Sequence, residues 1–208
     1  MKIGMIVAMD KEYSQLRPLF PEDKLILQKS GIATVNAAIQ TVEIIRQYKP
    51  DCIISSGCAG GNGDDINVQD VVVSSELTYH DVYCGRAIGD SVYGQVQGLP
   101  ARYQADPYLL EKAKQTGAKP GLIVTGDWFV DSKEKMREII GHFPEAKAVD
   151  MESCAIAQVC HIYKVPFISF RVISDIPLRD TDASMYHNFW DTVAENSFHV
   201  TKTFIESL

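Results

Sequence analysis

Short apolar runs rich in Val and Ile alternate with segments of helical periodicity along the chain. Runs such as "KIGMIVA", "DCIISSGCAG" and "PFISFRVISD" have the length and near-continuous hydrophobicity of buried strands, whereas "TVNAAIQTVEIIRQYK" repeats its apolar residues at helical spacing. Strands that are apolar on both faces are typical of parallel sheets covered by helices on both sides. The sequence therefore predicts an α/β fold, with a single domain over residues 1–208 and a central, mostly parallel, twisted β-sheet flanked by helices.

The remaining elements follow from the same two periods. Further strands are predicted at 24–29, 68–81 and 120–130, and in the run that ends at Asp150. Further helices are predicted at 10–20, 107–117, 132–143 and from about Ala183 onward, with Ser132 as an N-cap. Segment 82–103 is long, Gly-rich and irregular. Because loops of this kind are often lids, binding loops or interface elements, we expect it to border a site or a subunit contact.

Composition argues against several kinds of partner. The 208 residues carry a formal net charge of −7, which argues against nucleic acid or an anionic membrane. No apolar run is long enough to span a bilayer, and acidic residues follow the first apolar run too soon for a signal peptide. The five cysteines form no C-x-x-C pair, and no His/Cys spacing is typical of a zinc site. We therefore expect a cytoplasmic protein with no metal and no cofactor.

Chemistry-bearing residues stand where the predicted strands end. These ends are residues 9–12, 56–61, 125–129, 150–152 and 174–175, and nearly every one holds an acid, a glycine turn or an aromatic ring. The Gly-rich "SGCAGGNG" is neither a P-loop nor a clean dinucleotide fingerprint, so it indicates a tight turn or a close approach of backbone to a ligand. Ligands of open α/β sheets bind outside the carboxyl ends of the strands. The sequence therefore predicts a small-molecule site at this edge.

Individual residues at these ends have two interpretations. In "KAVDMESCAIAQVC", Asp150 and Glu152 separate a buried strand from an amphipathic helix, where acids complement the helix dipole, so capping is the simplest interpretation. Asp175, preceded by Ser174, is either a turn residue or a general acid with a raised pKa. Arg171 lies within the apolar run "FISFRVISD" and requires a buried acidic or polar partner.

Taken together, these segments resemble the 5′-methylthioadenosine/S-adenosylhomocysteine nucleosidases, within the purine nucleoside phosphorylase and hydrolase superfamily. The resemblance is carried, in order along nearly the whole chain, by "MKIGMIVAMDKE", "KSGIATVNAA", "SSGCAGG", "VVVSSELTYHD", "GLIVTGDWFV" and "HFPEAKAVDMESCAIAQVCHIYKVPFISFRVISD". Its most specific parts are "VDMES" and "RVISD" at their mutual spacing. It implies a phosphorylase/hydrolase-like fold, hydrolysis of the N-ribosidic bond with release of adenine, a role in methionine salvage and a homodimer.

The resemblance also implies roles for the residues that carry the chemistry. Asp175, held by Ser174, would protonate adenine N7 as the purine leaves. Glu12 would activate the attacking water, and Arg171 would support the region of Glu12 and the water. One acid must stay protonated while another stays ionised, which different solvation around the two groups can achieve.

Other residues would bind the substrate. Glu152 would grip the ribose hydroxyls, and Met151 would pack on the sugar. Phe129 would stack on adenine, and the backbone of Val130 would read the purine edge. Tyr186 would cover the ribose end.

The chain departs from the family pattern at several places. Cys58 stands where the family usually has serine, and a thiol is a weaker hydrogen-bonding group, so the water network is expected to differ. The region between 20 and 29 is shorter than in typical members. Segment 82–103 carries Arg86, Asp90 and Gln95, which are more polar than a methylthio group requires. These departures leave the 5′ substituent open.

Three functions are compatible with the sequence. The first is the thio-nucleoside hydrolase, and the second is a related purine nucleosidase, such as a futalosine hydrolase, with a different 5′ group. The third is a nucleoside-binding protein that has lost catalysis, which the presence of Glu12, Glu152 and Asp175 together argues against. Phosphorolysis would need a phosphate site, usually built with arginines. The sequence has no arginine near Gly57 to Gly61 or near Met9, so water is the expected nucleophile.

Overall fold

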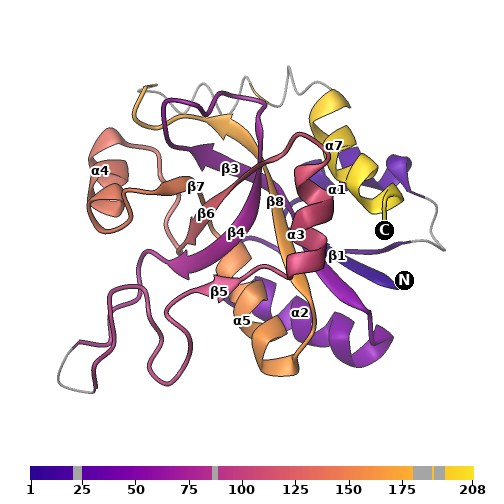
Figure 1. Cartoon of the computed structure of the whole chain (residues 1–208), viewed down its shortest axis with the longest axis horizontal. Helices are drawn as coiled ribbons and strands as arrows, with labels where there is room; N and C mark the ends of the chain where they lie inside the picture. Colours follow the sequence, from indigo (N-terminus) through magenta and orange to yellow (C-terminus); the bar gives the residue numbers. More distant parts are fainter. Residues whose placement is uncertain (21–24, 86–88, 180–188, 190–194) are drawn as a thin grey trace.

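The computed structural model describes residues 1–20, 25–85, 89–179, 189 and 195–208 of the chain. Its strands are β1 (Ile3–Val7), β2 (Leu25–Lys29), β3 (Cys52–Gly61), β4 (Val71–Tyr79), β5 (Tyr103–Gln104), β6 (Lys119–Thr125), β7 (Ala146–Asp150) and β8 (Phe167–Asp175). Its helices are α1 (Asp10–Leu16), the 3₁₀ turn η1 (Arg17–Leu19), α2 (Thr34–Tyr48), α3 (Pro107–Lys114), α4 (Lys133–His142), α5 (Ser153–Tyr163) and α7 (Glu195–Glu206). Figure 1 shows their arrangement around one central sheet.

The sheet is mixed and closes on itself. Strands β3, β7, β6, β4 and β8 form a ring in which each pairs with the next, and β1 and β2 extend the sheet from β3. The pairs β3/β7, β4/β5 and β4/β8 are antiparallel, and the other pairs are parallel. The α/β prediction is confirmed. Most pairs of the described strands are parallel, as predicted, but the sheet is mixed and closes into a barrel. The sequence did not predict the antiparallel pairs or the closure, because an apolar run can be buried equally well beside a parallel or an antiparallel neighbour.

Two glycines make the closure of the sheet possible. Gly60 and Gly61 pair with Val149 and Ala148 of β7, and the register of β3 against β8 shifts just before Gly60. A Cβ on Gly61 would lie 2.7 Å from the Ile173 side chain, so only glycine admits this approach. The Gly-rich stretch is therefore the corner of a strand that continues to Gly61.

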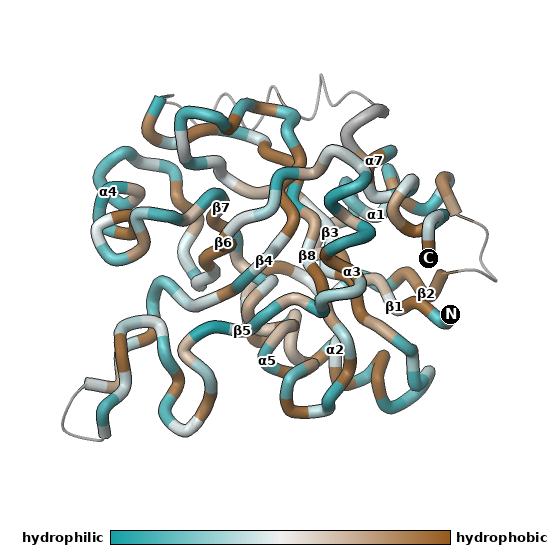
Figure 2. Tube along the Cα trace, in the orientation of Figure 1, coloured by the Kyte–Doolittle hydropathy of each residue, from teal (hydrophilic) through white to brown (hydrophobic). Residues whose placement is uncertain are grey.

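Helices cover both faces of the sheet. Alternate residues of β1 and β8 point to opposite sides, one packed on α1, α3 and α7 and the other on α2 and α5. In Figure 1, α2 and α5 lie together below the sheet, while α1, α3 and α7 lie on the other side. A third apolar cluster joins α4 to β6 and β7. Figure 2 shows hydrophobic residues both in the central strands and in the helices, and the buried ones form the clusters between the two, where burial stabilises the fold.

Most helix boundaries agree with the sequence analysis. Ser132 caps α4, since its Oγ accepts a hydrogen bond from the backbone N–H of Lys135 at 3.2 Å. The helix predicted at 10–20 is shorter, because α1 ends at Leu16 and Pro18 accompanies a 3₁₀ turn. The C-terminal helix is confirmed for Glu195–Glu206, and its predicted start near Ala183 lies outside the described residues. None of the described helices is long and apolar enough to cross a membrane.

Candidate active site

A pocket opens at the carboxyl ends of β1, β3, β6, β7 and β8, the edge at which a site was expected. Its described lining consists of Ala8, Met9, Glu12, Ile32, Cys58, Ala59, Gly60, Trp128, Phe129, Val130, Val149, Asp150, Met151, Glu152, Ser174 and Asp175. Of the residues expected at the site, Arg171 is buried beside this lining. Tyr186 lies outside the described residues, and all the others line the pocket.

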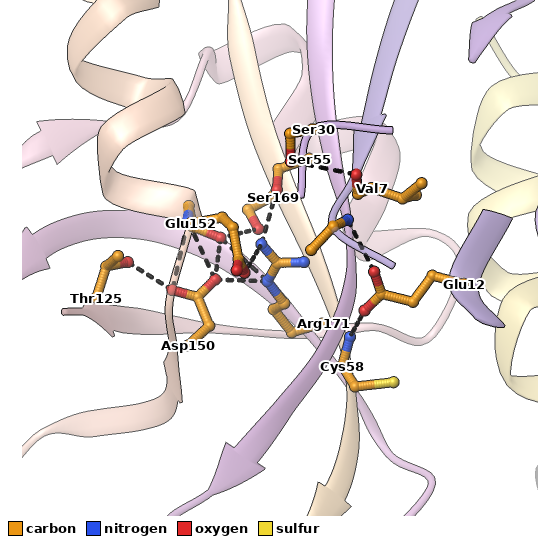
Figure 3. A network of polar contacts seen from close by, with 12 residues as sticks. Val7, Glu12, Ser30, Ser55, Cys58, Thr125, Asp150, Glu152, Ser169 and Arg171 are labelled. Carbon is orange, nitrogen blue, oxygen red and sulfur yellow. Dashed lines mark hydrogen bonds and ion pairs between the residues drawn. The ribbon is translucent and has the colours of Figure 1, made fainter. Parts of the chain in front are cut away.

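Glu12, in the first turn of α1, is turned into the protein and is 2% exposed. Its Oε2 accepts hydrogen bonds from the backbone N–H groups of Ala8 and Met9 at 2.8 and 3.0 Å. Its Oε1 accepts one from the N–H of Cys58 at 2.9 Å (Figure 3). Burial raises the pKa of Glu12, while the Arg171 guanidinium and these N–H donors oppose the rise. A carboxylate fixed in one orientation, with a raised pKa, is suited to accept a proton.

Arg171 in β8 has the buried acidic partner that the sequence required. Its Nε lies 2.5 Å from Asp150 Oδ2 and 3.1 Å from Ser153 Oγ, and its Nη2 donates to Ser55 Oγ at 2.8 Å (Figure 3). Thr125 Oγ1 also donates to Asp150, at 2.5 Å. Removing one member of such a buried pair would leave the charge of the other unpaired, which lowers the free energy of unfolding by about 3–5 kcal/mol. Asp150 is therefore used by this internal network.

The fold brings Arg171 beside Gly57, which corrects the inference that no arginine lies near that segment. A Cβ on Gly57 would lie 2.5 Å from Arg171 Nη1 and 2.5 Å from Glu12 Oε1. The two charged groups therefore approach each other across the bare Cα of Gly57. Arg171 is 1% exposed and already bonded to Asp150 and Ser55. It holds charges inside the protein, and it is not presented to a phosphate ion.

Glu152 stands at the N-cap position of α5, but its side chain does not cap that helix. Its Oε1 accepts a hydrogen bond from the backbone N–H of Ala33, at the start of α2, at 3.0 Å. Burial raises the pKa of Glu152 to about 7, with Arg171 opposing the rise and Asp150 and Glu12 adding to it. The simplest interpretation of this residue as a helix cap is therefore wrong.

Ser174 and Asp175 lie at the end of β8 and line the pocket. Ser174 Oγ lies 2.6 Å from Asp175 Oδ1 and 3.2 Å from the carbonyl oxygen of Ala59. A hydroxyl has one hydrogen to donate. Ser174 can therefore donate to Asp175 when the carboxyl group is ionised. When the group is protonated, Ser174 can accept from it and donate to Ala59. This pair tolerates either protonation state of Asp175.

Aromatic and apolar side chains complete the lining. Trp128 and Phe129 follow β6 and are 55% and 47% exposed, so neither ring is part of the core. Val130 is buried next to them, and Met151 is half-buried between the two acids of β7 and α5. Half-exposed rings at the mouth of a pocket offer flat apolar faces to a planar ligand.

Sequence reasoning missed one wall of the pocket. Ile32, two residues before the start of α2, is 49% exposed and lines the pocket. Thr34 donates to the Asp127 carboxylate from both its N–H, at 2.7 Å, and its hydroxyl, at 2.8 Å. No local pattern marks this contact, because it joins residues 93 positions apart. Among the described residues, no group of three or more His, Cys, Asp or Glu could hold a metal ion.

Comparison with known proteins identifies the family. Residues 16–206 match the model of the phosphorylase superfamily. The chain is 38% identical to a 5′-methylthioadenosine/S-adenosylhomocysteine nucleosidase of a Geobacillus species, over 100% of this chain and 99% of that protein. The chain belongs to the phosphorylase superfamily, among the 5′-methylthioadenosine/S-adenosylhomocysteine nucleosidases. A Bacillus velezensis nucleosidase is 35% identical, with complete coverage of both chains.

Solved structures of this nucleosidase family have the same fold. The enzyme of Neisseria meningitidis, in complex with methylthio-immucillin-A, superimposes with a TM-score of 0.90 at 37% identity, covering 100% of this chain and 99% of that one. The enzyme of Colwellia psychrerythraea, in complex with adenine, gives a TM-score of 0.92 at 31% identity, covering 100% and 96%. The phosphorylase/hydrolase-like fold expected from the sequence is confirmed.

Proposed function

We propose that the chain hydrolyses the N-ribosidic bond of 5′-methylthioadenosine and S-adenosylhomocysteine and releases adenine. The observation that carries the proposal is the convergence of Glu12, Glu152 and Asp175 in one pocket beside exposed aromatic rings. Relatives across the full length of the chain are nucleosidases for these two compounds, and a related structure contains adenine. A binding protein would need the aromatic rings and a ribose contact, but not a buried base such as Glu12.

Asp175 is the group that protonates the leaving purine. As the C1′–N9 bond breaks, electrons move onto the purine, and the sugar gains oxocarbenium character. Asp175 in its protonated form gives its proton to N7, so the base departs neutral. Ser174 supports this step, since its hydroxyl can satisfy both forms of the carboxyl group. Phe129 would stack on the purine, and the backbone of Val130 would contact its edge.

Glu12 is the general base that activates the attacking water. Its carboxylate takes a proton from water as the water oxygen bonds to C1′, which completes the hydrolysis. The backbone N–H groups of Ala8, Met9 and Cys58 fix its orientation. Arg171 keeps a positive charge close to Glu12 and so favours the ionised base. The thiol of Cys58 is not needed for this arrangement.

Glu152 and Met151 would bind the sugar. Both line the pocket just beyond the end of β7. A carboxylate accepts hydrogen bonds from the two ribose hydroxyls, and the thioether packs on the apolar face of the ring. Tyr186 is proposed to cover the ribose end on the resemblance alone.

The polar composition of segment 82–103 left a futalosine-type substrate open, but the contacts of Gln95 give this alternative little support. Gln95 Oε1 accepts a hydrogen bond from the N–H of Val92 at 3.1 Å, and its Nε2 donates to the carbonyl oxygen of Leu99 at 2.8 Å. These polar groups are used within the loop itself. Arg86 lies outside the described residues. Gln95 therefore gives no reason to prefer a futalosine-type substituent over the thioether-linked 5′ groups of methylthioadenosine and S-adenosylhomocysteine.

We also propose a cytoplasmic homodimer built from a single domain. Val35 and Ile39, on one side of α2, are 65% and 58% exposed, next to the half-exposed Ile32 and Trp128 at the pocket mouth. A second copy seated there would cover apolar surface that is costly to leave in water. All five cysteines are free, which is usual in a reducing compartment.

The decisive experiment measures base release without phosphate. Purified protein is incubated separately with methylthioadenosine, S-adenosylhomocysteine, adenosine, inosine and futalosine, and the free base is quantified by chromatography. We expect adenine from the two thio-nucleosides. Glu12→Gln and Asp175→Asn each remove one proton-transfer group, so we expect each to slow the reaction by about 10²–10⁴-fold.

Each other outcome has a definite meaning. Base release only from futalosine or inosine would retain the mechanism and change the substrate. Tight nucleoside binding without release of any base would overturn the proposal in favour of a binding protein. Unchanged rates in both variants would overturn the assigned roles of Glu12 and Asp175.

A further inference from the structure

Helix α2 begins without a cap of its own. Its N-cap residue is Ala33, which has no side-chain acceptor, and no side-chain capping bond is made there. Ala33 also has φ 81° and ψ 164°, a region of backbone conformation that is largely restricted to glycine. The first N–H groups of a helix need acceptors from elsewhere in such a case.

Two carboxylates from distant segments supply these acceptors. Glu152 accepts from the N–H of Ala33 at 3.0 Å. Asp127 accepts from the N–H of Thr34 at 2.7 Å and from its hydroxyl at 2.8 Å. Negative charge is favoured at the positive end of a helix, and here it comes from the loops after β6 and β7. Hydrogen bonds to these two carboxylates thus hold the start of α2 against the pocket.

Asp127 is itself held firmly in place. Its N–H donates to Asp81 Oδ2 at 2.7 Å, just beyond the end of β4. The preceding residue, Gly126, packs closely against the same group, since a Cβ there would lie 2.7 Å from the Asp81 carboxyl group. The next residues, Trp128 and Phe129, line the pocket. Asp127 therefore joins the aromatic wall to the wall that contains Ile32.

Position distinguishes this contact from an ordinary surface cap. Ile32 lines the pocket one residue before Ala33, and Ala33 donates to Glu152, the group assigned to the ribose hydroxyls. A backbone in a strained conformation persists only where its surroundings hold it. Loss of the hold on Thr34 would release Ala33 from Glu152 and Ile32 from the pocket wall together.

We propose that Asp127 is a positioning residue that sets the substrate affinity of the site by docking the start of α2 against Glu152. This inference rests on the proposed nucleosidase function and adds to it. Asp127 does not touch the reacting atoms. It acts through Ala33 and Glu152, on binding of the nucleoside and not on the chemical step.

The kinetic test separates binding from chemistry. In Asp127→Ala we expect KM for methylthioadenosine to rise about tenfold, the usual scale for loss of a helix cap, with kcat changed less than about twofold. Thr34→Val removes only the hydroxyl and should give a smaller rise in KM. Thr34→Ser keeps both donors and should have the KM of the wild-type protein. Asp131→Asn removes the same charge from an exposed position in the same loop and serves as the matched control.

A second measurement needs no substrate, so it separates failure of this inference from failure of the proposed function. Hydrogen–deuterium exchange of the segment that begins α2 should accelerate about tenfold in Asp127→Ala and stay unchanged in Asp131→Asn and Thr34→Ser. An equal loss of kcat with unchanged KM would overturn the inference. Unchanged exchange at the start of α2 in Asp127→Ala would overturn it as well, whether or not the wild-type protein hydrolyses nucleosides.

Discussion

Glu12 Oε1 accepts a hydrogen bond from the backbone N–H of Cys58 at 2.9 Å, across 46 positions of sequence. The contact uses the main chain of Cys58, so the side chain at this position does not orient the carboxylate. Burial raises the pKa of the Cys58 thiol well above its ordinary value, and the nearby Glu12 adds to this effect. The thiol is therefore neutral, and the departure of this chain from the serine usual in the family leaves the position of Glu12 intact.

Exchange of Cys58 for serine tests this conclusion. Because the N–H of residue 58 is retained, we expect kcat/KM of Cys58→Ser to stay within about threefold of the wild-type value. Steady-state kinetics with methylthioadenosine measures it, with Glu12→Gln as the inactive reference. A loss comparable to that of Glu12→Gln would show that the thiol takes part in the water network.

Gly57 is predicted to be intolerant of any side chain. A Cβ there would lie 2.5 Å from both Arg171 Nη1 and Glu12 Oε1, so both groups would have to move. Displacement of a catalytic group by about 1 Å can cost about 100-fold in rate, and we expect a fall of kcat of this order in Gly57→Ala.

The matched control for this substitution is Gly141→Ala. Gly141 lies in α4, and a Cβ there would meet nothing within 4 Å. Alanine is favoured over glycine inside helices by about 0.5–1 kcal/mol, so this variant should be fully active and slightly more stable. Normal kcat in Gly57→Ala, with the fold preserved by circular dichroism, would contradict the close approach of Arg171 and Glu12 to Gly57.

Glu152 is expected to make stability depend on pH. Burial raises its pKa from 4.5 to about 7, so the folded state holds the proton more tightly than the unfolded state. This contribution is complete below pH 4.5 and is lost as the pH rises through 7, a decline of about 3 kcal/mol in the free energy of unfolding.

Urea unfolding of Glu152→Gln and of the wild-type protein between pH 4 and pH 8 tests whether the contribution of Glu152 to stability falls as the pH rises. The variant cannot ionise at this position, so its stability relative to the wild-type protein should increase steadily from about pH 4.5 to 7 and then level off. Parallel curves for the two proteins would mean that Glu152 titrates normally in the folded state.

Ala33 is predicted to be replaceable by glycine with a gain in stability. Its φ of 81° is unfavourable for any residue with a Cβ. Relief of this strain outweighs the greater freedom of glycine in the unfolded chain. We therefore expect the free energy of unfolding of Ala33→Gly to be about 1 kcal/mol higher than that of the wild-type protein. Thermal unfolding measures the effect. A fall in the melting temperature would mean that the native backbone at Ala33 is not strained.

The sequence was sufficient for most of the elements and for most of the residues that line the pocket. Hydrophobic periods of two and 3.6 residues are local, so the strands and helices could be placed from short windows. The acids, aromatics and glycines at the strand ends pointed to one edge, and the pocket lies there. Motifs such as "VDMES" and "RVISD" identified the family, because they keep their order and spacing whatever the tertiary contacts are.

The tertiary structure alone decided which groups meet. Asp150 pairs with Arg171, Glu12 is held by the N–H of Cys58, and Asp127 holds Thr34, at separations of 21, 46 and 93 residues. Closure of the mixed sheet creates these neighbours, and closure depends on strand direction, which an apolar run does not encode. The raised pKa values of Glu12 and Glu152 follow from the same burial. Sequence therefore determined which chemical groups are present, and packing determined their partners and their protonation.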